Sequence, residues 1–158
     1  MIRRKPASRK TLVADAQEVT RACAGVNIRL AARRITRFLE TRMPSNLSLA
    51  QFGLMAHIAA AGDDTIGALA ERSGLDQSTL SRNLRALERD GLVEIAVAEE
   101  DLRRRAVWLT ETGARRLEAA IPAWRRAHKA LCALIDPCDV REIATSTAAL
   151  GGGENSQQ

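Results

Sequence analysis

The chain has 158 residues, enough for one domain that buries its own core without disulfides or a structural metal. Its net charge of +5 and sequence pI near 9.8 suit a polyanionic partner, although charge alone fits a membrane surface equally well. Aromatic residues make up only 3% of the chain and tyrosine is absent, which argues against binding of single strands or RNA by base stacking.

The cysteines Cys23, Cys132 and Cys138 are odd in number and lack the spacing of a disulfide framework. No apolar run approaches the length of a signal peptide or a membrane-spanning helix. We therefore expect a cytoplasmic protein with reduced thiols and no membrane partner.

Residues 1–10 are basic and lack apolar periodicity, so we expect a mobile tail. From about 12 to 43 the pattern is helical, with one apolar stripe through Ile28 and Ile35 and a second through Cys23 and Val26. A helix that is apolar on two sides packs on two sides, which predicts that a partner chain covers one of them. Gly25 weakens this helix and marks a bend or its true beginning.

Pro44 should end this long helix, and a second helix should begin after Ser48. Ser48 and Gln51 have the spacing of a capping box, and Leu47 and Phe52 have that of a hydrophobic staple. The core face of this second helix is predicted to hold Phe52, Met55, Ala56 and Ala59, with His57 off that face.

Two short helices joined by a tight turn follow from Thr65 onward. Thr65 is positioned to cap the first of them, and Ser73-Gly74 ends it with a glycine that can adopt the left-handed conformation. Asp76 then caps the second. This arrangement predicts a helix-turn-helix.

The second helix of this pair, Gln77 to Asp90, separates apolar from polar residues. Leu80, Leu84 and Leu87 share one side, and the opposite side carries Ser78, Arg82, Arg85 and Arg89. Short polar residues crowd its N-terminal end, namely Gln77, Ser78, Thr79 and Ser81. Because that end contacts base edges when such a helix lies in the major groove, we interpret it as a DNA-reading helix. An ordinary solvated surface helix is the alternative.

Gly91 should close the reading helix, and alternating apolar residues then predict a hairpin. Val93, Ile95 and Val97 form its first strand, while Val107 and Leu109 lie in its second. Residues 98–105 between them are too polar to bury and are predicted to form an exposed tip, a wing. Asp101 and Arg103 can brace this tip, which leaves Arg104 or Arg105 free to enter a minor groove, although an arginine run also serves plain solubility.

Thr110 should cap a last long helix with an apolar seam at alternating spacings of four and three. Its members are Leu117, Ile121, Trp124, His128, Leu131 and Ile135. The seam fits either a copy of itself across a two-fold axis or the core of one subunit. Pro122 should kink this helix, a short helix should follow from about 139 to 149, and residues 151–158 should form a flexible tail.

These elements predict one domain over 1–158, mainly α with a small β-hairpin wing (α+β). A winged helix-turn-helix head at about 48–110 would sit on a dimerisation lobe made of helices at about 12–43 and 111–149.

The residues of the head resemble the multiple antibiotic resistance regulator (MarR) family. The matching motifs are Leu47-Ser48-Leu49-Ala50-Gln51-Phe52, Asp76-Gln77-Ser78-Thr79-Leu80-Ser81-Arg82, Glu88-Arg89-Asp90-Gly91-Leu92-Val93, Asp101-Leu102-Arg103 and Leu109-Thr110-Glu111-Thr112-Gly113. The resemblance extends over roughly residues 27–134 and implies a dimeric, ligand-responsive transcription factor. It also implies a long helix that joins the DNA-binding head to the dimer interface.

Two kinds of effector follow from this resemblance. Cys23 lies at nearly the distance before Gln51 that the peroxide-sensing cysteine occupies in the family's organic hydroperoxide regulators. Those relatives use tyrosines beside the thiolate, so here Arg21, Arg29 or a helix N-terminus would have to activate it. Cys132 is then the better resolving thiol and Cys138 the second, unless all three are packing residues.

The other effector is an aromatic acid in the family's usual pocket between lobe and head, for which Arg34 or Arg37 and Trp124 are the predicted lining residues.

Three other function classes were weighed. An enzyme is disfavoured, because the chain has no Gly-rich phosphate loop and no motif that places serine beside histidine, and we expect no cofactor. A metal-responsive regulator could use His128 and Cys132, four apart on one helix, with Cys138, but these residues lack a close-spaced pair and packing is the favoured explanation. A winged helix used only for protein contacts would normally be less cationic.

The sequence therefore predicts a homodimeric repressor that binds a pseudo-palindromic double-stranded DNA operator and responds to a small aromatic molecule or an oxidant.

Overall fold

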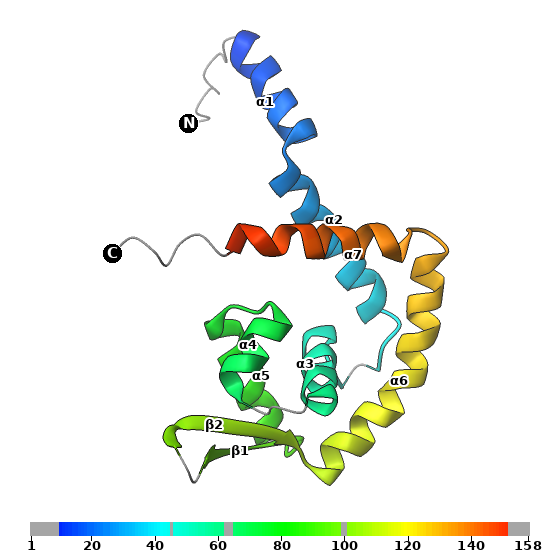
Figure 1. Cartoon of the computed structure of the whole chain (residues 1–158). Coiled ribbons are helices and arrows are strands. Elements are labelled where there is room, and N and C mark those ends of the chain that lie inside the picture. Colours follow the sequence, from blue (N-terminus) through cyan, green and yellow to red (C-terminus); the bar gives the residue numbers. More distant parts are fainter. Residues whose placement is uncertain (1–9, 45, 62–64, 99–100, 152–158) are drawn as a thin grey trace, which may run out of the picture. The chain divides into compact units, whose positions relative to one another are not determined.

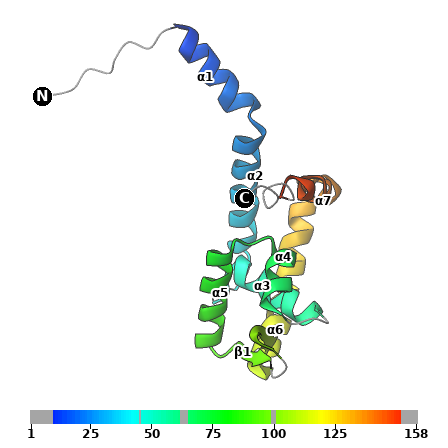
Figure 2. The same cartoon turned by 60° about the vertical axis from the view of Figure 1, so that its left-hand side comes forward.

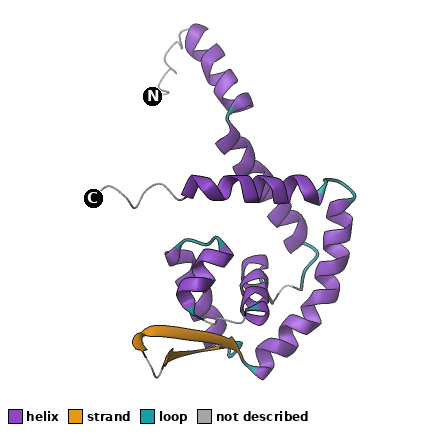
Figure 3. Ribbon diagram, in the orientation of Figure 1, coloured by secondary structure: helices purple, strands orange, loops and turns teal. Residues whose placement is uncertain are grey.

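The computed structural model describes residues 10–44, 46–61, 65–98 and 101–151 (Figure 1). The chain forms two compact units, Met1–Arg37 and Phe38–Gln158, which are described separately. Its described elements are helices and one two-stranded antiparallel sheet (Figure 3). The predicted fold class, mainly α with a small hairpin, is therefore confirmed. The predicted tails 1–10 and 151–158 lie outside the described residues, except that Lys10 begins a helix and Gly151 ends one.

The predicted first long helix is two helices, α1 at Lys10–Ala22 and α2 at Ala24–Glu40. The break falls at Cys23, two residues before the glycine that predicted it. The Asn27 side chain bridges the break by donating to the Arg21 carbonyl at 2.9 Å. The end of α2 precedes the predicted limit, Met43, because residues after Glu40 turn and Arg42 donates back to the Phe38 carbonyl at 2.9 Å.

Helix α3, Leu49–Ala60, begins with the predicted capping box. The Gln51 backbone N–H donates to Ser48 Oγ at 3.2 Å, and the Ser48 N–H donates to Gln51 Oε1 at 3.0 Å. The staple residues Leu47 and Phe52 are both buried. The predicted core face was partly wrong, because Ala59 is exposed whereas Leu54 and Ile58 are buried. The burial is wider than one stripe because α3 contacts α4, α5, α6 and the second strand.

The core of the second unit lies where α3, α4 (Ile66–Ser73), α5 (Gln77–Arg89) and the hairpin meet. Its most deeply buried side chains are Leu54, Met55, Leu69, Leu80, Leu87, Leu92, Val93 and Val107. Apart from Leu54, each comes from a position that the apolar periodicity placed inward or from the turn after α5. The described part of the chain contains no helix that is both long and apolar enough to cross a bilayer.

The hairpin pairs β1, Val93–Ala98, with β2, Asp101–Leu109. Val93 faces Leu109 and Ile95 faces Val107, as the alternation predicts. The predicted tip at 98–105 was too long, because Ala98 pairs with Asp101 and β2 already begins there. Arg105 pairs with Val97 in this ladder, so polarity alone does not end a ladder. The register shifts between Val97 and Ala98, and residues 99–100 lie outside the described structure.

Helix α6, Glu111–Cys132, begins at the predicted cap, where the Gly113 N–H donates to Thr110 Oγ1 at 2.9 Å. Leu117 is buried in the core, and Ile121 and Trp124 pack against that core. The first half of the predicted seam therefore faces its own subunit. Ile135 lies beyond the end of α6.

The ribbon of α6 bends along its length, and Pro122 lies inside the helix (Figure 1). The short helix predicted from 139 begins earlier: α7 spans Pro137–Ser146 because Asp136 caps it and a proline is well suited to its first turn. A 3₁₀ turn, Thr147–Gly151, follows.

The junction between wing and α6 has no room for a side chain at Gly113, where an added Cβ would lie 1.9 Å from the Leu92 carbonyl oxygen. Gly113→Ala should therefore force a backbone shift and lower the free energy of unfolding by about 1–3 kcal/mol. Gly67→Ala is the matched control, since a Cβ there meets nothing within 4 Å and should raise stability by about 0.5–1 kcal/mol. Urea unfolding measures both, and equal effects would contradict the packing described here.

Candidate nucleic-acid interface

The turn between α4 and α5 has the predicted geometry. Thr65 caps α4, and its hydroxyl accepts the Ala68 N–H at 3.3 Å. Gly74 adopts the left-handed conformation at φ 62°, which turns the chain sharply enough to start α5 three residues later. Asp76 caps α5 through the Thr79 N–H at 2.8 Å. This is a helix-turn-helix.

Helix α5 buries one side and exposes the other. Leu80, Leu84 and Leu87 are buried in the core against α3 and the hairpin. All but one of the predicted reading residues are exposed: Gln77, Ser78, Ser81, Arg82, Arg85 and Arg89. The exception is Thr79, which is half-buried. Figure 2 shows α5 at one edge of the head, with α3 and α4 on its inner side.

The carboxylate of Asp76 makes more hydrogen bonds than a cap needs. Ser78 Oγ donates to its Oδ1 at 2.6 Å, and Thr79 Oγ1 donates to its Oδ2 at 2.7 Å. These side-chain bonds, together with the Thr79 N–H, hold the pKa of Asp76 well below its usual range. The exposed carboxyl group is ionised at neutral pH.

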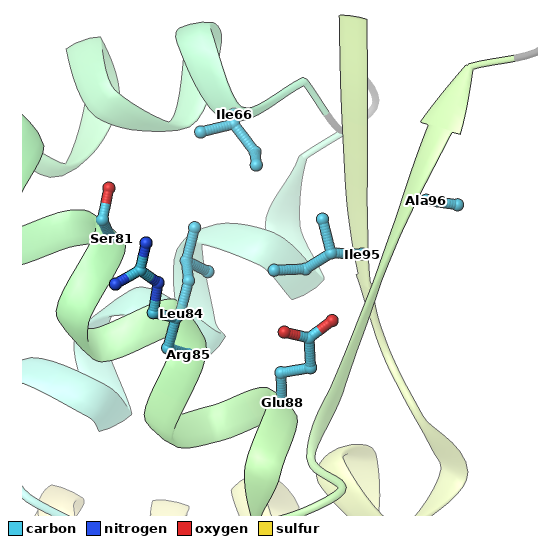
Figure 4. A pocket seen from close by; sticks show the side chains of 7 residues that line it. All are labelled: Ile66, Ser81, Leu84, Arg85, Glu88, Ile95 and Ala96. Atoms are coloured by element: carbon cyan, nitrogen blue, oxygen red, sulfur yellow. The ribbon is translucent and has the colours of Figure 1, made fainter. Parts of the chain in front are cut away.

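A groove of about 350 Å³ separates α5 from α4 and β1 (Figure 4). Ile66, Leu84 and Ile95 form its apolar part, and α5 contributes Ser81, Arg85 and Glu88. Arg85 thus lies between the reading face and the wing side of α5 (Figure 4). Sequence periodicity had placed Arg85 only on the solvent face.

The wing places its arginines in a strand. Asp101, Arg103, Arg104 and Arg105 belong to β2, but their side chains lie outside what the structure describes, so the brace between Asp101 and Arg103 stays a prediction. Near the base of the hairpin, Trp108 Nε1 donates to Glu94 Oε2 at 3.0 Å across a register pair. Sequence reasoning missed this pair, although the alternation places both residues on the outer face.

Known proteins share this architecture. A model of the MarR family matches residues 45–104. The transcriptional regulator MosR of M. tuberculosis, solved in complex with DNA, is 34% identical to this chain with a TM-score of 0.69, and the match covers 81% of this chain and 96% of MosR.

The chain belongs to the MarR family. Members of this family are transcription regulators with a DNA-binding winged helix and are not enzymes. The predicted family and the prediction that the chain is not an enzyme are therefore confirmed.

Two further solved structures share the fold. PcaV of Streptomyces coelicolor, in complex with its natural ligand, is 19% identical with a TM-score of 0.71, over 83% of this chain and 93% of PcaV. BpsR of Bordetella bronchiseptica, whose DNA binding is regulated by 6-hydroxynicotinic acid, is 20% identical with a TM-score of 0.66, over 80% of this chain and 96% of BpsR. No curated protein sequence matched the chain.

A second cavity of this MarR-family chain, about 410 Å³, lies between α3 and α6. Its walls are mostly apolar, with Phe52, Leu117, Ile121 and Trp124 among them, and Arg125 supplies a charge. The Phe52 and Trp124 rings stack at 6.0 Å between centroids. Trp124 was predicted for such a pocket, whereas Arg125 was missed.

Arg34 and Arg37, the other residues predicted for that pocket, lie exposed on α2 in the first unit. Their role in a pocket stays a prediction.

The three cysteines are free. Cys23 is half-buried at the break between α1 and α2, and Cys138 is exposed in the first turn of α7. The Cys132 Sγ atom lies 3.2 Å from His128 Nδ1, and the His128 ring packs 5.0 Å from that of Trp124. Within the described ranges, no three His, Cys, Asp or Glu side chains gather as a metal site would require.

Proposed function

We propose that this MarR-family chain is a homodimeric repressor that binds a pseudo-palindromic DNA duplex and is released by a small aromatic ligand or an oxidant. In this proposal α5 lies in the major groove and the hairpin approaches the adjacent minor groove.

The burial pattern of α5 carries this proposal. With Leu80, Leu84 and Leu87 held in the core, the arginines of the opposite face lie exposed, with Arg85 beside the groove between α5 and the hairpin. Arginine is the side chain that most often contacts guanine, and it also binds phosphate. The exposed Gln77 and Ser78 at the N-terminal end add groups that can bond to base edges.

A second copy of the chain is the partner that the exposed apolar residues favour. Leu12, Val13, Val19, Val26, Ile28 and Leu30 of the first unit are exposed, as are Leu134, Val140 and Ile143 of the second. Leu12 is 59% exposed and Leu134 is 70% exposed. Exposed apolar side chains that are grouped in this way mark an interaction surface. A two-fold dimer of the terminal helices would cover both sets and present two reading helices to one duplex.

Relatives support the DNA-bound and repressor parts of the proposal. MosR has been solved with DNA, and the transcriptional repressor CouR, 21% identical to this chain, has been solved on a 23-mer duplex.

Replacing Arg82 or Arg85 with alanine should lower specific affinity by about 1–3 kcal/mol and relax sequence preference, because each side chain would reach a base edge. Replacing Arg104 and Arg105 should instead weaken binding with a shallower salt slope, because wing cations neutralise phosphate or enter a narrow groove. Binding to a selected duplex across a salt series measures both effects.

Lys129→Ala is the control for this series, since it removes the same charge from an exposed position on α6. Wing variants that bind with wild-type affinity and salt dependence would contradict the wing assignment. Arg82 and Arg85 variants that behave like Lys129→Ala would contradict the reading-helix assignment.

The dimer should be stable at micromolar concentration, and its operator should have two half-sites about 10 bp apart centre to centre, so that both α5 helices enter successive major grooves. Analytical ultracentrifugation and selection of bound sequences from a random duplex pool measure these two properties. A stable monomer in that concentration range, or a selected site without two-fold symmetry, would argue against the dimer.

The cavity between α3 and α6 suits an aromatic carboxylate. Phe52 and Trp124 offer ring faces, Leu117 and Ile121 add apolar contacts, and the Arg125 guanidinium can pair with the carboxylate. A ligand bound between α6 and α3 would change the distance between the α5 helices of the two subunits.

An oxidant would act on thiols instead. A hydroperoxide would oxidise the Cys23 thiolate to a sulfenic acid and leave as the alcohol. Cys132, or else Cys138, of the partner subunit would then attack the sulfenic sulfur, which forms a disulfide between subunits and releases water. Arg21 and Arg29 lie within six residues of Cys23 in sequence and are the cations proposed to favour its thiolate. His128, which contacts Cys132, can accept the proton of that thiol.

Challenge of the protein–DNA complex with phenolic acids and with a hydroperoxide should separate the two effectors. If a phenolic acid releases the wild-type protein from DNA, and Trp124→Leu or Arg125→Gln abolishes that release, the cavity is supported as the ligand site. Release by hydroperoxide that dithiothreitol reverses and Cys23→Ser abolishes would support the thiol. Peroxide release that persists in Cys23→Ser would rule out Cys23 as the sensor, and phenolic release unchanged in both cavity variants would rule out the cavity.

A further inference from the structure

The hydroxyl groups of Ser78 and Thr79, at the start of α5, both donate their protons to the carboxylate of Asp76. Ser78 Oγ donates to Asp76 Oδ1 at 2.6 Å, and Thr79 Oγ1 donates to Oδ2 at 2.7 Å. An ionised carboxylate only accepts hydrogen bonds, so the direction of both bonds is settled. Asp76 is ionised at neutral pH like any exposed aspartate, and the same bonds lower its pKa further.

A hydroxyl group carries one proton and two lone pairs. Once the proton points to Asp76, the oxygen of Ser78 or Thr79 can only accept from a partner outside the helix. In the major groove the donors are the N4 amino group of cytosine and the N6 amino group of adenine. Guanine N7 and O6, thymine O4 and phosphate oxygens are all acceptors, and none of them can bond to a hydroxyl in this state.

Capping alone does not account for this network. An N-cap side chain needs one oxygen to accept a backbone N–H, and Asp76 Oδ1 does so from Thr79 at 2.8 Å. The Thr79 hydroxyl bonds to Oδ2, and the Ser78 hydroxyl adds a second bond to Oδ1. Ser78 is exposed and Thr79 is half-buried, so neither residue is enclosed in the core.

We infer that Asp76 determines part of the sequence specificity: by holding the protons of Ser78 and Thr79, it makes the start of α5 select bases that present an amino group in the major groove. The inference rests on the proposed DNA-reading role of α5. It assigns Asp76 the part of a positioning residue, which acts through the two hydroxyls and does not itself need to contact a base.

Asp76→Asn tests this with the cap preserved, because asparagine caps helices as well as aspartate does. Its carbonyl oxygen can keep the Oδ1 bonds from the Thr79 N–H and Ser78. Its amide nitrogen then stands in for Oδ2 and donates to Thr79 Oγ1, which frees the Thr79 proton to point outward. The variant therefore reverses Thr79 from acceptor to donor and leaves Ser78 an acceptor.

The experiment is selection of bound sequences from a random duplex pool by the wild type, Asp76→Asn, Thr79→Val and Ser78→Ala. Thr79→Val should flatten a preference for adenine or cytosine at one position. Asp76→Asn should shift that same position towards guanine or thymine, with a change in relative affinity of roughly fivefold, as expected for one altered base contact. Ser78→Ala should flatten a different position, which Asp76→Asn leaves unchanged.

Thermal unfolding followed by circular dichroism checks that each variant is folded. If Asp76→Asn does not fold, Thr79→Val and Ser78→Ala alone test whether the two hydroxyls set the base preference. Wild-type preference retained in Asp76→Asn at the Thr79 position would overturn the inference, as would preferences unchanged in both Thr79→Val and Ser78→Ala. In those cases a wild type that still selects a sequence leaves the proposed function standing. A wild type that selects none would overturn both.

Discussion

Burial of the leucine side of α5 is the constraint on which the rest of the head depends. Leu80, Leu84 and Leu87 are almost completely removed from water, and burying each such side chain stabilises the fold by about 1.5–3 kcal/mol. Rotating α5 about its axis would expose them, so the orientation of the arginine face follows from the core. The hairpin is held to the same core through Leu92, whose carbonyl oxygen accepts the Thr110 N–H at 3.1 Å, and Thr110 Oγ1 donates to the Gly91 carbonyl at 2.7 Å. Reading helix, wing and the start of α6 are thereby fixed to one another.

Most of the head could be predicted from the sequence because its signals are local. Caps at Ser48, Thr65, Asp76 and Thr110 depend on a side chain and a backbone N–H three residues on, which any helix start brings together. Gly74 ends its helix for an equally local reason, a backbone conformation at φ 62° that other residues rarely adopt. The apolar period of α5 belongs to the same class, since it needs only the geometry of one helix.

Most of the features that sequence reasoning missed depend on how separate elements meet. Polarity could not give the length of the wing tip, because the pairing of Ala98 with Asp101 is a property of two strands together. Ala59 looked like a core residue on its own helix, yet it is exposed at the cavity between α3 and α6. The cavity residue Arg125 was missed because its neighbours, Phe52 and Ala56, are some 70 residues earlier in the sequence. The hydrogen bonds from the Ser78 and Thr79 hydroxyls to Asp76 are local, but they were also missed. Recognising them requires the positions of both Asp76 carboxylate oxygens, which the sequence does not give.

The central claim is that α5 reads base edges in the major groove. Protection of guanine N7 from dimethyl sulfate tests it most directly, because that atom lies on the major-groove edge and is methylated only where nothing covers it. On a duplex selected by the wild-type protein, we expect protected guanines in two successive major grooves on one face of the duplex, and their exposure when Arg82 and Arg85 are replaced by alanine. Full methylation of every guanine N7 within a bound site, or protection that survives loss of both arginines, would contradict it.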